Sequence, residues 1–111
     1  MTRKQALAEL IEKVEAGDRS ASLRKTPLKG FGGYYEGCLN GSLDAAKALH
    51  EAVLPDFIAY PQAGGSSAGV RVWSCTVENW IEGQEYHGEN QPDPARAWLL
   101  AILRARHAQE S

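Results

Sequence analysis

The segment Val70–Val77, "VRVWSCTV", constrains the fold more than any other stretch of this 111-residue chain. It is rich in β-branched and aromatic residues, which favour a β-strand. Side chains alternate between the two faces of a strand. One face carries Val70, Val72, Ser74 and Thr76, and the other carries Arg71, Trp73, Cys75 and Val77. Because both faces hold apolar groups, the segment predicts a sheet that is covered on both sides.

Two further strands are predicted beside this one. "FIAYP", which begins at Phe57, is a short continuous apolar run, and "QEYHGE" at Gln84–Glu89 follows a turn around Gly83. The glycine-rich "AGGSSAG" at 63–69 is typical of a hairpin connection. We therefore expect a small antiparallel sheet of about three strands.

Helices are predicted at the two ends of the chain. Arg3–Ala16 has an apolar stripe at helical spacing, formed by Leu7, Leu10, Ile11 and Val14. The last helix begins at Pro94, with Asp93 as its capping residue. Its apolar stripe comprises Ala95, Trp98, Leu99, Ile102 and Ala105. Each pattern indicates a helix with one buried face.

A third helix is predicted between Ser42, a favourable N-cap, and Pro55, which ends it. One side of this helix is mostly alanine and comprises Ala45, Ala46, Ala48, Leu49, Ala52 and Val53. Small side chains allow a neighbour to approach closely, and we expect that neighbour to be the sheet. The sequence thus predicts one α+β domain over residues 1–111, with helices on both faces of the sheet in α/β/α layers.

Residues 19–40 contain several glycines and are predicted to form a long ordered loop held by Phe31, Tyr34 and Tyr35. The glycines of this loop do not match a phosphate-binding loop, because Lys25 and Thr26 precede them instead of following them. Glycines that permit turns are the simpler interpretation. The sequence predicts no cofactor.

Charge and cysteine content limit the classes of protein. The formal net charge of −2 disfavours a dedicated nucleic-acid binder. The N-terminus carries charges within its apolar stretch, and no apolar run approaches the roughly 20 residues of a membrane span. We therefore expect a cytoplasmic protein that does not contact membranes. In that compartment Cys38 and Cys75 are expected to be buried thiols rather than a disulfide.

Several segments resemble one known family. "SLDAAKALHEAVLPD" at Ser42–Asp56 is similar to the helix-to-proline segment of the phage ABA sandwich domain family. "PARAWLLAILRAR" at Pro94–Arg106 is similar to its closing helix, and "VRVWS" and "EYHGE" resemble its strands. The resemblance covers Gly41–Arg106. It departs from the family at Asp93, where a threonine is usual, and in the glycine-rich segment before Asn40.

The resemblance implies a small phage or prophage-encoded protein with α, β and α layers, located in the cytoplasm of a bacterial host. It carries over no established activity and no site residues. Our own expectation is a phage or prophage-encoded protein of unknown role that is non-enzymatic and acts through protein contacts.

The residues themselves offer candidates for a partner-binding surface. On a helical wheel Leu100 lies beside Arg96 and Arg104, away from the apolar stripe, and such a leucine could contact a protein partner or a second copy. Trp80, Tyr34 and Tyr35 lie in loop-like surroundings and are further candidates. These six residues form the predicted partner-binding set.

Two alternatives remain open at this point. Glu85, His87 and Glu89 point the same way if they lie in a strand, and they could form a pH-sensitive base or a loose metal site. The competing interpretation is a solvent-facing row on an edge strand. The order α-β-β-β-α after Ser42 also resembles that of double-stranded-RNA-binding domains, although the last helix begins with an acid. His50 is interpreted as a structural histidine with a local hydrogen bond.

Overall fold

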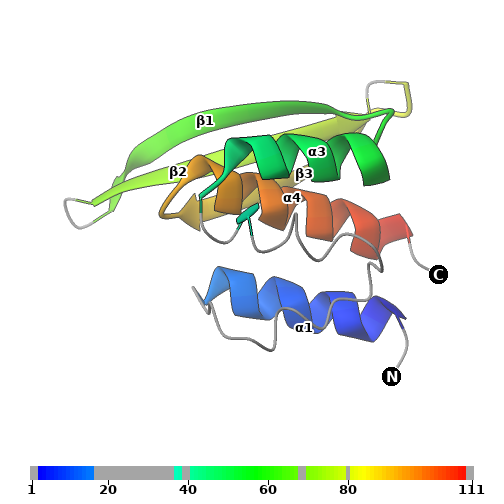
Figure 1. Ribbon diagram of the computed structural model, residues 1–111, viewed down its shortest axis with the longest axis horizontal. Coiled ribbons are helices and arrows are strands. Elements are labelled where there is room, and N and C mark those ends of the chain that lie inside the picture. Colours follow the sequence, from blue (N-terminus) through cyan, green and yellow to red (C-terminus); the bar gives the residue numbers. More distant parts are fainter. Residues whose placement is uncertain (1–2, 17–36, 39–40, 68–69, 80, 110–111) are drawn as a thin grey trace.

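The chain is α+β, with three helices and a three-stranded antiparallel sheet in the part that the structure describes (Figure 1). The structure is a computed structural model and describes residues 3–16, 37–38, 41–67, 70–79 and 81–109. The predicted fold class is confirmed. The elements in chain order are α1 (Arg3–Glu15), α3 (Leu43–Val53), β1 (Ile58–Ser67), β2 (Val70–Asn79), β3 (Gln84–Gln91) and α4 (Pro94–Gln109).

The sheet has the order β1-β2-β3, and its register assigns each side chain to one of two faces. Directly paired residues on neighbouring strands share a face. The inner face, on which Cys75 and Val77 are buried, contains the rows Ala59–Val77–Tyr86 and Pro61–Cys75–Gly88. The outer face contains the rows Ile58–Glu78–Glu85 and Tyr60–Thr76–His87.

Helix α4 is the centre of the molecule. It packs across all three strands, and α1 and α3 make their main contacts with α4. Figure 1 shows α4 between the sheet and α1. Because neighbours surround α4, it is apolar on nearly all sides. Its buried residues are Ala95, Arg96, Ala97, Leu99, Leu100, Ala101, Ile102, Leu103 and Ala105.

Helix α4 lies directly on β3 at Gly88, where no side chain separates the two backbones. A Cβ atom added to Gly88 would overlap the Ala97 carbonyl oxygen and would lie 2.9 Å from both the Ala101 nitrogen and the Leu100 Cβ. The alanines of α4 make this approach possible, and Leu100 is fully buried against the strand. The prediction that Leu100 is exposed is therefore wrong, because its side of α4 faces the sheet and not solvent.

Arg96 is also fully buried, contrary to the prediction that it flanks an exposed leucine. Its Nη2 donates a hydrogen bond to the Val14 carbonyl at 3.2 Å. Val14 lies in the last turn of α1, where backbone carbonyls have no partner within the helix. Arg96 therefore satisfies the end of α1 and ties it to α4.

None of the described helices covers the outer face of the sheet (Figure 1). Ile58 and Tyr60 are 44% and 43% exposed, and the side chains of Glu85 and His87 are also exposed. The prediction that helices cover both faces is therefore wrong for the described residues. The β-branched residues of β2 suggested burial, but such residues also favour strands that are only partly buried, as Val72 and Thr76 are.

Both predicted caps are confirmed. The Ala45 amide donates to the Ser42 hydroxyl oxygen at 3.2 Å, and the Arg96 amide donates to the Asp93 carboxylate at 2.8 Å. The alanine side of α3 has a different neighbour from the one predicted, because the main contacts of α3 are with α4. At Ala45 the small side chain allows the close approach of Gly37, since a Cβ on Gly37 would lie 2.5 Å from the Ala45 Cβ.

Cys38 and Cys75 are free and buried, as predicted. Burial raises the pKa of each thiol to about 12, and the Asp93 carboxylate also contributes to this shift at Cys38. Because only the thiolate is a strong nucleophile, neither cysteine is set up for covalent chemistry at neutral pH. None of the described helices combines the length and the apolarity needed to cross a membrane.

The contact at Gly88 generates a prediction about stability. We expect Gly88→Ala to lower the free energy of unfolding by about 3 kcal/mol, because the added methyl group meets backbone atoms that cannot move aside. Urea denaturation followed by far-UV circular dichroism measures this change. Gly83→Ala is the control: Gly83 has a φ of 74° and open space around it, so its cost of about 1 kcal/mol is purely conformational. Equal losses in the two variants would contradict the tight α4–β3 contact.

Candidate functional site

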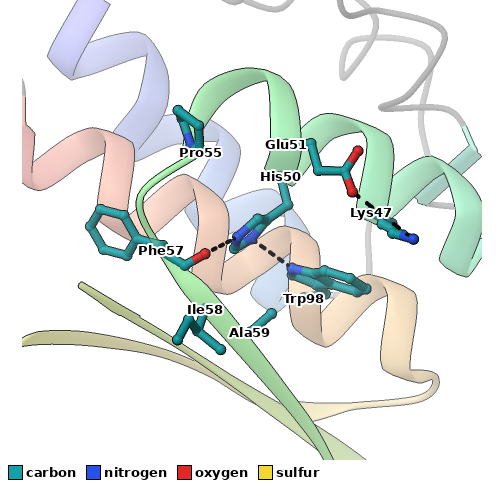
Figure 2. A pocket seen from close by; sticks show the side chains of 8 residues that line it. All are labelled: Lys47, His50, Glu51, Pro55, Phe57, Ile58, Ala59 and Trp98. Carbon is teal, nitrogen blue, oxygen red and sulfur yellow. Dashed lines mark hydrogen bonds and ion pairs between the residues drawn. The ribbon is translucent and has the colours of Figure 1, made fainter. Parts of the chain in front are cut away.

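A pocket of about 420 Å³ lies where α3, the start of β1 and the N-terminal part of α4 meet (Figure 2). Its lining combines aromatic, aliphatic and charged side chains. The lining residues are Lys47, His50, Glu51, Pro55, Phe57, Ile58, Ala59 and Trp98. Apolar pockets with a few polar groups are the usual places where proteins bind other molecules.

The turn after α3 builds one wall of this pocket. Pro55 cannot continue the helix, and the Leu54 amide closes the last turn by donating to the His50 carbonyl at 2.8 Å. The Phe57 amide then donates to the Leu54 carbonyl at 3.1 Å. This reversal brings the Phe57 backbone beside the His50 ring and starts β1 at the edge of the pocket.

The His50 ring lies at the back of the pocket with both nitrogens hydrogen-bonded (Figure 2). The Trp98 indole N–H donates to Nδ1 at 3.1 Å, so Nδ1 must be the acceptor nitrogen. Nε2 then carries the proton and donates to the Phe57 carbonyl at 2.7 Å. The two rings meet edge to face, 5.6 Å apart. The predicted local hydrogen bond of His50 is confirmed, and the ring is buried.

The rim of the pocket is charged on one side and apolar on the other. Lys47 and Glu51 occupy successive turns of α3, with 4.0 Å between Nζ and Oε1, and both side chains are largely exposed. Ile58 forms the opposite rim and also belongs to the outer face of the sheet. Because the ring nitrogens of His50 and Trp98 are already paired, the interior of the pocket is best suited to an apolar group.

The Glu85–His87–Glu89 row lies on the exposed β3 edge of the sheet. His87 Nδ1 is hydrogen-bonded to the Thr76 hydroxyl at 2.9 Å, and its Nε2 lies 3.8 Å from a Glu85 carboxylate oxygen. Glu89 follows Gly88 where the β2–β3 register shifts. The described residues contain no group of three His, Cys, Asp or Glu side chains arranged to hold a metal ion.

The predicted partner-binding set does not form one surface. Leu100 and Arg96 are buried, and Arg104 is engaged within the molecule. Its Nη2 lies 2.5 Å from a Glu15 carboxylate oxygen, and its Nη1 donates to the His87 carbonyl. Trp80, Tyr34 and Tyr35 lie outside the described residues.

Sequence reasoning did not find the pocket. A signal was present in His50 and Trp98, because each has an apolar ring and a polar nitrogen that needs a partner when it is buried. The two residues are 48 positions apart in the sequence, so the sequence alone does not indicate that they pair. Only the packing of α3 against α4 brings the two rings together.

Comparison of the chain with protein-family models, curated proteins and solved structures gives no match. The resemblance to the phage ABA sandwich domain family therefore remains a prediction from the segments that carry it.

The His50–Trp98 hydrogen bond is open to a direct test. Trp98→Phe should lower the free energy of unfolding by about 2 kcal/mol, because it leaves the buried Nδ1 acceptor of His50 without a donor. Trp73→Phe is the matched control, since Trp73 is half-buried and its indole has no hydrogen bond among those of the described residues. If denaturation gave equal losses for the two variants, the assigned ring pairing would be wrong.

Proposed function

We propose that this chain is a phage or prophage-encoded protein that acts in the host bacterial cytoplasm through protein contacts and not through catalysis. The proposal is supported by the segments that resemble the phage ABA sandwich domain family and by the surface around the pocket. The layers implied by that resemblance do not contribute to the proposal, because one face of the described sheet is open.

The observation that carries the proposal is the exposed apolar surface next to the pocket. Ile58 and Tyr60 point the same way from β1, two residues apart, and each is more than two-fifths exposed. Ile58 also lines the pocket, so the apolar surface continues around the edge of β1. Exposed aliphatic and aromatic side chains beside a pocket are typical of protein interfaces.

The chemistry of the same region favours binding over catalysis. A general base needs a nitrogen or oxygen that is available to the substrate. The pocket histidine has both nitrogens engaged by the Phe57 carbonyl and the Trp98 indole. The other described histidine with polar neighbours, His87, lies on the open face of the sheet and outside the pocket.

The exposed outer face is a feature that favours the RNA-binding alternative. Double-stranded-RNA-binding domains share the order α-β-β-β-α and leave one sheet face uncovered. The charges oppose it. The described outer face carries Glu78 and Glu85, and Asp93 caps the start of α4. Phosphates require the opposite sign of charge, so protein contact remains our proposal.

A pull-down from a bacterial host lysate tests the proposal. We expect the wild-type chain to capture at least one protein, and the double variant Ile58→Ser, Tyr60→Ser to capture about tenfold less of it, because the apolar contact is lost. Leu43→Ser is the matched control, since Leu43 is 46% exposed at the start of α3. Circular dichroism verifies that all three chains are folded.

Two results would contradict the proposal. One is the absence of any protein captured specifically by the wild-type chain. The other is equal capture by the wild type and by the double variant, which would show that Ile58 and Tyr60 do not contribute.

A further inference from the structure

We propose that the outer face of the sheet binds a partner segment that combines apolar side chains with lysine or arginine. The inference rests on the proposed function and specifies the chemistry of the partner. It follows from the arrangement of apolar and acidic side chains on neighbouring strands.

The outer face is divided into an apolar side and an acidic side. β1 contributes Ile58 and Tyr60, and in the same row as Ile58 the next two strands contribute Glu78 and Glu85. Side chains directly opposite each other on neighbouring strands have Cβ atoms about 5 Å apart. A single extended or helical segment can therefore contact the apolar and the acidic sides together.

The acidic character continues past the end of the sheet. A second pocket, of about 410 Å³, lies beside the β2–β3 turn and includes Asp56 and Glu82 in its lining. Asn79 and Gln84, which pair in the row next to Glu78 and Glu85, line the same pocket. Asp56 and Glu82 thus lie at the same end of the sheet as Glu78 and Glu85, but beside a pocket on the side where the helices pack.

Among the described residues, few cationic side chains lie close enough to the carboxylates of this face to neutralise their charge. His87 lies 3.8 Å from Glu85 and is hydrogen-bonded to Thr76 through its other nitrogen. Arg104 reaches the backbone carbonyl of His87, but its carboxylate partner is Glu15 of α1. A cationic partner would supply the missing positive charge.

A second copy of this chain does not fit the same face. In a two-fold interface each residue of the contact meets the same surface on the other subunit. Because the described rows of this face contain no lysine or arginine, Glu78 and Glu85 would meet no such cation on a second copy, and burying them there would oppose association. The charge pattern therefore favours a different, basic partner.

Electrostatics and apolar contact would make separable contributions to the affinity. Exposed carboxylates interact weakly in water, and the Debye length is about 8 Å at physiological ionic strength, so their contribution falls with salt. The contribution of Ile58 and Tyr60 depends on buried apolar area and is less sensitive to salt. Binding that weakens with added salt without disappearing is the expected signature.

Two synthetic peptides test the inference by fluorescence anisotropy. Each has about ten residues, long enough to cross the sheet, and alternates leucine with arginine in one peptide and leucine with glutamate in the other. We expect the arginine peptide to bind the wild-type chain and the glutamate peptide to bind at least about tenfold more weakly. Raising sodium chloride from about 50 mM to about 300 mM should weaken the first interaction.

Matched charge variants locate the binding face. Glu78→Gln with Glu85→Gln should weaken arginine-peptide binding about tenfold. Glu9→Gln with Glu12→Gln removes the same charge from exposed positions of α1 and should change it less than about twofold. Equal losses in the two double variants, equal affinity for both peptides, or no binding of the arginine peptide would each overturn the inference.

The two proposals can fail separately. A protein captured through Ile58 and Tyr60 whose binding is unchanged by Glu78→Gln with Glu85→Gln would overturn the basic partner and leave the contact function intact. If the lysate yields no specific protein, the contact function fails, whatever the peptides bind.

Discussion

The close approach of α4 to β3 at Gly88 is the constraint on which the rest of the structure depends. At this point the alanines of the helix meet the strand without an intervening side chain, and Leu100 fills the space beside the contact. A side chain at position 88 would push the helix away from the sheet. The sides of α4 that face away from β3 contact α1 and α3.

Polar side chains of α4 then fix where those two helices lie. Arg96 donates to the Val14 carbonyl and Arg104 pairs with Glu15, so two arginines hold the C-terminal end of α1. Positive charge at that end is also favoured by the helix dipole. The Trp98–His50 hydrogen bond joins α4 to α3. The pocket lies between these two helices and the start of β1. The described helices thus all pack on one side of the sheet, and Ile58 and Tyr60 on its outer face are exposed.

Local signals in the sequence were sufficient to predict the elements but not their layers. Proline positions, capping residues and apolar periodicity gave the helices, and Ser42 and Asp93 cap α3 and α4 as expected. The layer order depended on Arg96 and Leu100. An arginine is seldom fully buried, and nothing near Arg96 in the chain indicates that its partner is a carbonyl 82 residues away. The prediction that the outer face is covered failed for a related reason. The preference of valine and threonine for strands does not indicate which face of a strand is exposed to solvent. The pocket required tertiary packing and could not be read from either segment alone.

Native-state hydrogen exchange tests the central position of α4 most directly. The amides of 99–103 should exchange only through global unfolding, so that their free energy of exchange equals the free energy of unfolding obtained with urea. The amides of α1, which packs on the outside of α4, should exchange at the same or a lower free energy. If the amides of α4 exchanged at a free energy well below that of global unfolding, while those of α1 remained fully protected, α4 would not be the central helix and this account of the fold would be wrong.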